Sequence, residues 1–135
     1  MVQYNEKRDI ISGICLCNYP NVPSLSPDEW INWLYTLYKV QDVTEGNSMF
    51  VHFLVWDKRY TGHFFEELTT SVFDSASYLQ HMLLVLPPQI IPGDIFEGQM
   101  IRVPLRCSVD KYSNQSIYMT CCHLENTRLR IRRIV

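Results

Sequence analysis

The side chains that could support catalysis are few in this 135-residue chain, which carries four histidines, five cysteines and one pair of adjacent glutamates. Glu66 and Glu67 adjoin a predicted strand over 63–66, where neighbouring side chains point to opposite faces, so they could not share one substrate as acid and base. His52 lies in an apolar segment, which favours a structural histidine. The sequence contains neither a glycine-rich phosphate loop nor a Gly-x-Ser-x-Gly or His-Glu-x-x-His motif. We therefore expect a protein that is not an enzyme.

The cysteines give no sign of a metal site or a disulfide framework. They are Cys15, Cys17, Cys107, Cys121 and Cys122, an odd number without Cys-x-x-Cys spacing. Structural zinc sites usually take their ligands from turns, whereas Cys15 and Cys17 fall on a predicted strand. These patterns predict small buried thiols, with no metal and no cofactor.

Charge is distributed unevenly along the chain. Residues 1–99 hold 5 basic and 12 acidic side chains, whereas residues 100–135 hold 7 and 2. The basic end could attract a polyanion, or it could pair with acidic surface of this chain or of a partner. No apolar run approaches the ~18 residues of a membrane span, and the start lacks the apolar region of a secretion signal. We expect an intracellular protein with no membrane partner.

Hydrophobic periodicity and turn residues predict one domain over residues 1–135. Strands are expected at 9–17, 49–56, 63–66, 95–108, 116–124 and 128–135, separated by turns such as 57–62 and 111–114. Helices are expected at 27–40 and 74–86. The first is predicted to start with Ser26 as cap, Pro27 at the first helical position and Glu29 completing a capping box.

This element order fits a five-stranded OB-type barrel with a helix between its third and fourth strands. The 27–40 helix is then an insertion after the first strand. The alternative is a mixed α+β sandwich.

Two segments resemble the OB-folds of telomere-end-protection proteins. They are Phe50–Asp57, which reads FVHFLVWD, and Leu86–Ile95, which reads LPPQIIPGDI; the similarity extends over residues 49–125. In that family a strand closing on Trp-Asp and a Gly-Asp pair opening the fourth strand are recurrent. The resemblance implies nuclear location at chromosome ends, with either recognition of single-stranded DNA there or assembly with other members of the same end-binding complex.

Two sets of side chains are predicted to bind. Aromatic stacking and a basic groove hold single strands, and the candidates for this role are Trp56, Lys58, Arg59, Tyr60, Phe64, Arg102, Arg106 and Lys111. The apolar stripe of the first helix is the candidate partner-binding face, formed by Trp30, Trp33, Leu37 and Tyr38.

The sequence thus favours a non-enzymatic OB-fold subunit of a telomeric or single-strand-DNA complex, acting mainly through protein–protein contacts. The alternative is an autonomous, sequence-tolerant binder of single-stranded nucleic acid.

Overall fold

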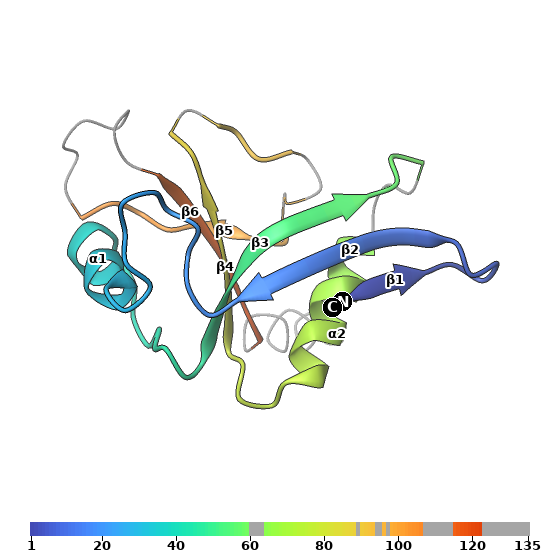
Figure 1. Ribbon diagram of the computed structural model, residues 1–135, viewed down its shortest axis with the longest axis horizontal. Helices are drawn as coiled ribbons and strands as arrows, with labels where there is room; N and C mark the ends of the chain where they lie inside the picture. Colours follow the sequence, from blue (N-terminus) through green and yellow to red (C-terminus); the bar gives the residue numbers. More distant parts are fainter. Residues whose placement is uncertain (60–63, 89, 94–95, 97, 107–114, 123–135) are drawn as a thin grey trace, which may run out of the picture.

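An open six-stranded sheet with a helix on each face forms the structure, a computed structural model (Figure 1). It describes residues 1–59, 64–88, 90–93, 96, 98–106 and 115–122. The strands are β1 (Val2–Tyr4), β2 (Ile10–Cys17), β3 (Ser48–Trp56), β4 (His81–Leu86), β5 (Ile101–Arg102) and β6 (Ser116–Cys121). The helices are α1 (Trp30–Leu37) and α2 (Phe64–Ser75).

The sheet is mixed, with strand order β1-β2-β3-β4-β6-β5. Its central pair, β3 and β4, is parallel and is connected through α2; every other neighbouring pair is antiparallel. Because β1 and β5 lie at opposite edges, the sheet does not close, and the predicted five-stranded barrel is wrong. The protein is an α+β structure, as in the alternative.

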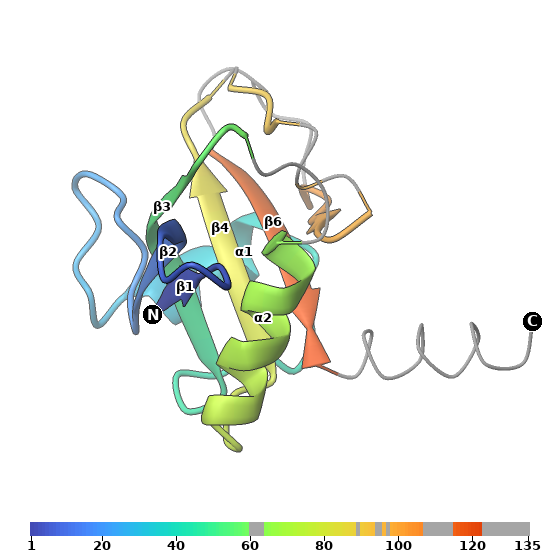
Figure 2. The ribbon, with the colours of Figure 1, turned by 90° about the vertical axis from the view of Figure 1, so that its right-hand side faces the viewer.

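Helix α2 covers one face of the sheet (Figure 2). Leu68 and Val72 of the helix are buried with Ile14 of β2 and Met82 of β4 in one core cluster. Helix α1 packs on the opposite face, where Trp30 and Leu34 lie against Phe50, Leu83 and Ile117. Adjacent strand residues such as Met82 and Leu83 therefore enter different cores, which explains why β4 is apolar on both sides.

The chain between residues 63 and 86 differs from the prediction. The described part of the expected strand 63–66 is the start of α2, and the expected helix 74–86 ends in strand β4. Leu79, Met82 and Leu83 are spaced as on a helix, but a short apolar run buried on both faces fits a central parallel strand equally well. Because α1 and α2 cover its two faces, this segment forms a strand and not a helix.

Helix α1 starts later than its predicted cap. Its first residue is Trp30, with Glu29 before it and no side-chain capping hydrogen bond. The Ser26 carbonyl instead accepts the Glu29 N–H at 3.0 Å, which closes a turn around Pro27 and Asp28. The predicted Ser26 cap is therefore wrong, although the helix exists.

Three of the expected strands are confirmed, with small shifts at their ends, as β2, β3 and β6. Within the described part of 95–108 the structure has a short strand, Ile101–Arg102. Strand β1 was not predicted. The predicted turn 111–114 and strand 128–135 lie outside the described residues.

Candidate functional site

An opening between the central strands is the main candidate site. Strands β3 and β4 pair through Ser48–His81, Met49–Met82 and Phe50–Leu83, and then separate. Beyond this point β4 stays paired with β6 as far as Leu86, and β3 stays paired with β2 as far as Trp56. The gap contains a cavity of about 340 Å³, which lies near the lower end of the roughly 300–1,000 Å³ usual for ligand sites.

The wall of the opening on β4 offers the main chain of Val85. Val85 lies opposite Ile117 of β6, and the Ile117 carbonyl accepts the Val103 N–H at 2.8 Å. The main chain of Ile117 therefore faces away from β4. In an antiparallel pair this makes Val85 and Ile117 a non-hydrogen-bonded couple, so the Val85 N–H and C=O point towards β3, where strand pairing has already ended.

The wall on β3 offers the main chains of Leu54 and Trp56. The Asp57 N–H donates to the Ile11 carbonyl at 2.7 Å, so Asp57 faces β2. Main-chain direction alternates along a strand, and the register with β2 is regular from Phe53 to Trp56. Leu54 and Trp56 consequently direct their N–H and C=O groups into the opening.

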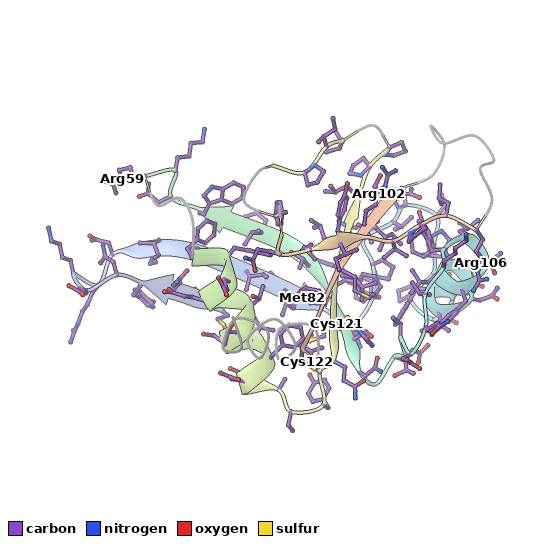
Figure 3. All side chains as sticks on the ribbon, turned by 180° about the vertical axis from the view of Figure 1, so that it is seen from behind. Arg59, Met82, Arg102, Arg106, Cys121 and Cys122 are labelled. Atoms are coloured by element: carbon purple, nitrogen blue, oxygen red, sulfur yellow. The ribbon has the colours of Figure 1, made fainter. Side chains whose placement is uncertain are left out.

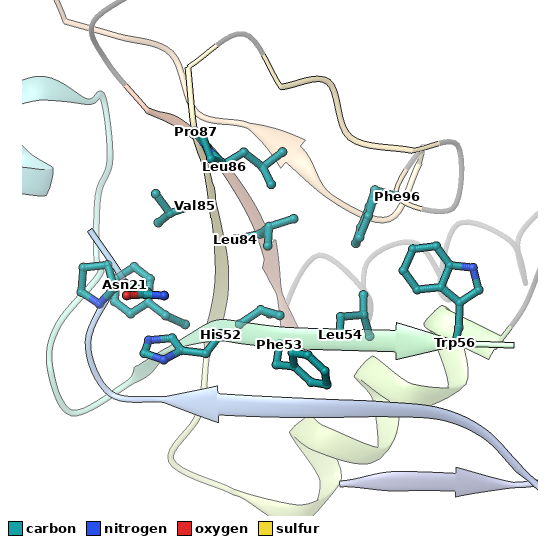
Figure 4. Close-up of a pocket in the computed structure, with 13 residues that line it drawn as sticks. Asn21, His52, Phe53, Leu54, Trp56, Leu84, Val85, Leu86, Pro87 and Phe96 are labelled. Carbon is teal, nitrogen blue, oxygen red and sulfur yellow. The ribbon is translucent and has the colours of Figure 1, made fainter. Parts of the chain in front are cut away.

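The described side chains around the opening carry no formal charge, except that His52 can be protonated. They are Pro20, Asn21, Phe50, Val51, His52, Phe53, Leu54, Trp56, Leu84, Val85, Leu86, Pro87 and Phe96. Figure 4 shows Trp56 and Phe96 near one end and Asn21 and His52 near the other. The site therefore suits a largely apolar ligand that also carries hydrogen-bonding groups.

His52 is held in place by the segment after β2. Its Nε2 lies 2.6 Å from the Tyr19 carbonyl oxygen, to which it donates, and its ring packs edge-on against the Tyr19 ring with centroids 5.0 Å apart. An irregularity in the β2–β3 register, between Cys15 and Leu16, places His52 as an extra residue on β3. These contacts make His52 a structural residue, in agreement with the sequence interpretation.

A second feature is an uncovered part of the sheet face opposite α2. Val2, Gly13 and Val55 lie side by side in register, and Cys15 lies beside Phe53 on the same face. The exposed fractions are 47% for Val2, 60% for Phe53 and 45% for Val55. Helix α1 lies over the other end of this face, against β4 and β6, and leaves these side chains open to solvent.

A cysteine and a histidine meet at the other end of the sheet. His81 Nδ1 lies 3.1 Å from Cys121 Sγ, and His81 Nε2 lies 3.1 Å from the Asp42 carbonyl oxygen. Because a carbonyl only accepts, Nε2 carries the proton and Nδ1 accepts from the thiol. Burial, with a further contribution from Cys122, raises the pKa of the Cys121 thiol above 9.0. The pair therefore lacks the lowered thiol pKa of a cysteine nucleophile.

The described cysteines depart from the predicted buried thiols. Cys15 is exposed, and Cys17, Cys121 and Cys122 are all partly exposed, so none of the described cysteines is the fully buried thiol that was predicted. Cys107 lies outside the described residues.

The residues predicted to bind nucleic acid do not form one groove. Lys58 and Arg59 follow β3, and Figure 3 shows Arg59 at the end of the molecule opposite Arg106, with Arg102 between. Arg59 pairs with Asp57 at 2.7 Å, and hydrogen bonds from Arg59 lower the pKa of Asp57 to about 2. Arg106 Nε donates to the Tyr35 carbonyl at 2.6 Å.

The aromatic candidates are used within the chain. Trp56 stacks on Phe64 with centroids 6.0 Å apart and an interplanar angle of 23°, and Phe64 is only 5% exposed. Phe64 is therefore a core side chain, whereas Trp56, at 36%, stays accessible from the opening. Tyr60 and Lys111 lie outside the described residues.

The predicted partner-binding stripe packs inside the domain. Trp30 and Tyr38 are each 1% exposed, and Trp33 and Leu37 pack against the same cluster from its border. The Tyr38 hydroxyl donates to the Gln115 carbonyl. A partner contact at this helix stays a prediction, but its apolar face is already buried by the chain itself.

Leu84, Val85 and Leu86 were not predicted as site residues, because they were placed in a helix. The run His81–Leu86 is short and almost wholly apolar, a pattern that fits a buried strand and a buried helix segment alike.

A family model for cilia- and flagella-associated protein 61, N-terminal domain, matches residues 1–134 of the chain. The chain belongs to this family. The resemblance to telomere-end-protection proteins is therefore wrong, and with it the predicted telomeric or single-strand-DNA function and the nuclear, chromosome-end location. The short motifs behind that resemblance are a strand end and a turn, which recur in many folds.

Two features are absent from the described residues. No helix there is long and apolar enough to span a bilayer. No group of three or more histidine, cysteine or acidic side chains gathers there in a way that could hold a metal ion.

Proposed function

We propose that this domain is a non-enzymatic protein-docking module of a ciliary or flagellar assembly. The family description supports the setting. The observation that carries the docking role is the uncovered sheet face with Val2, Phe53 and Val55 exposed side by side. Contiguous exposed apolar surface on a folded domain marks sites where another protein binds.

The absence of catalysis is supported by the chemistry of the strongest reactive pair in the described residues. In the Cys121–His81 pair, desolvation of the partly buried Cys121 thiol raises its pKa, so the neutral thiol predominates near pH 7. His81 is held by the Asp42 carbonyl and by Cys121 at once. This arrangement stabilises the sheet end where β4 and β6 meet.

The test uses the 135-residue chain fused to a fluorescent protein and expressed in ciliated cells. The fraction that remains with the axoneme after detergent extraction is compared for the unaltered chain, Val55→Asp and Ile101→Asp. Val55 is on the uncovered face, whereas Ile101 is a similarly exposed β-branched residue of β5, with exposed fractions of 45% and 50%.

We expect Val55→Asp to weaken retention more than about tenfold, because docking would bury an unpaired carboxylate. Ile101→Asp should leave retention close to that of the unaltered chain. Equal retention of all three proteins, or a chain that never enters cilia, would refute the proposal. Circular dichroism of the purified variants controls for unfolding.

A further inference from the structure

We infer that the opening between β3 and β4 binds an extended, uncharged peptide segment of a partner protein, which adds as a short strand between the two walls. The inference rests on the proposed docking function and names the chemistry of the partner. Its site shares Phe53 with the uncovered sheet face but is built on the main chains of Val85, Leu54 and Trp56, so variants at Val85 and at Val55 test the two separately.

The first argument is the main chain on both walls. Val85 on β4, and Leu54 and Trp56 on β3, direct N–H and C=O groups into the opening, as the hydrogen bonds on the outer sides of these strands require. Main-chain groups withdrawn from water need partners. An extended peptide supplies donors and acceptors at the spacing of a strand on both of its edges.

The second argument is the lining. Its described residues include no lysine, arginine, aspartate or glutamate, so these residues give no ion pair to a charged ligand, and entry of a charge among them would cost its hydration. Trp56 and Phe96 provide aromatic surface at one end (Figure 4). When a peptide adds as a strand, main-chain hydrogen bonds supply the affinity, and surfaces of this kind select among the side chains of the peptide.

The third argument is the geometry of the separation. The two strands are already parallel neighbours over Ser48–Phe50 and His81–Leu83, so a strand entering from the open end meets two walls that converge. Each wall is fixed from behind, β3 by β2 and β4 by β6. Binding therefore requires little rearrangement of the sheet.

The probe is a random dodecapeptide display library selected on the 135-residue chain. The strongest binder is synthesised, its affinity is measured by fluorescence anisotropy, and each of its amides is N-methylated in turn. We expect the central residues to be uncharged. N-methylation should weaken binding about tenfold at each of the central positions, whose amides face β3 and β4 alternately and so all lose a main-chain hydrogen bond, and should leave binding nearly unchanged at the two ends of the peptide.

Protein variants locate the site. Val85→Pro removes an N–H that faces the opening and is not used in the ladder with β6, so β4 can keep its pairing. Val85→Ala keeps that N–H and controls for loss of the side chain. We expect Val85→Pro to abolish binding and Val85→Ala to retain it within about threefold. If Val85→Pro fails to fold, hydrogen exchange of the unaltered chain decides, through slower exchange of the Val85 amide when peptide is bound.

Four results would overturn the inference: no peptide selected, no loss of binding on N-methylation of consecutive central residues, equal loss for Val85→Pro and Val85→Ala, or an unchanged Val85 amide. Selected peptides that bind Val85→Pro but not Val55→Asp would show docking on the uncovered face instead. If any of these results is found while chains that keep Val55 show normal axonemal retention, the inference fails and the proposed function stands.

Discussion

Replacing Tyr38 by phenylalanine tests how the α1 core is held to β6. The Tyr38 side chain is 1% exposed, its hydroxyl donates to the Gln115 carbonyl, and its ring packs edge-on to Trp33 with centroids 5.5 Å apart. Tyr38→Phe keeps the ring and leaves the carbonyl without this donor. Loss of a buried hydrogen bond costs about 1–3 kcal/mol, which lowers Tm by roughly 4 °C per kcal/mol in a domain of this size.

The same residue predicts a dependence on pH. Burial raises the pKa of Tyr38 from 10.0 to about 12, partly offset by the charge of Arg102. The unfolded chain thus loses this proton near pH 10 while the folded chain keeps it. The stabilisation from the protonated hydroxyl is complete below pH 10 and is lost as pH rises towards 12, by at most about 2–3 kcal/mol.

The assay is urea unfolding of the unaltered chain and of Tyr38→Phe at pH 8 and at several values between 10 and 12. The stability difference should be about 1–3 kcal/mol at pH 8 and should shrink above pH 10, since other titrating groups are common to both proteins. Tyr78→Phe, at a 58% exposed position, is the control and should change little. A difference that stays constant up to pH 12 would refute the reasoning.

Three further predictions concern the core, the helix start and the thiol. Met82→Ala should destabilise the protein by about 2–5 kcal/mol, because Met82 is 0% exposed, whereas Ile91→Ala, at 87% exposed, should change urea stability by less than about 0.5 kcal/mol. Ser26→Ala should also change the free energy of unfolding by less than about 0.5 kcal/mol, since α1 has no side-chain cap. A loss of about 1 kcal/mol, measured by thermal unfolding, would show that Ser26 does cap the helix. The rate at which iodoacetamide alkylates Cys121, measured by mass spectrometry, should keep rising past pH 9 because the pKa of this thiol is raised. A midpoint of that rate below pH 9 would contradict the raised pKa.

The strands bounded by clear turn residues could be predicted from the sequence. Residues 9–17 end at Asn18-Tyr19-Pro20 and residues 49–56 end at Asp57, and these strands are β2 and β3. Such boundaries depend on local chemistry that a single sequence displays.

The central strand β4 could not be predicted in the same way. Its helical spacing and its strand character are both consistent with the residues, and the choice depends on helices packed against its two faces from elsewhere in the chain. The candidate site was missed for the same reason, because an opening beside a central strand cannot be predicted while that strand is assigned to a helix. Trp56, proposed from the sequence as a stacking residue for nucleic acid, is partly accessible, and its role in binding stays a prediction.

The two edge strands of the open sheet affect whether copies of the domain pair with one another at high local concentration. The edge strands β1 and β5 have three and two residues, and β5 ends in Arg102. Short and charged edges are poor templates for pairing with another copy. Copies of the domain should therefore resist joining into continuous intermolecular sheets at high local concentration, such as repeated positions along a filament would impose.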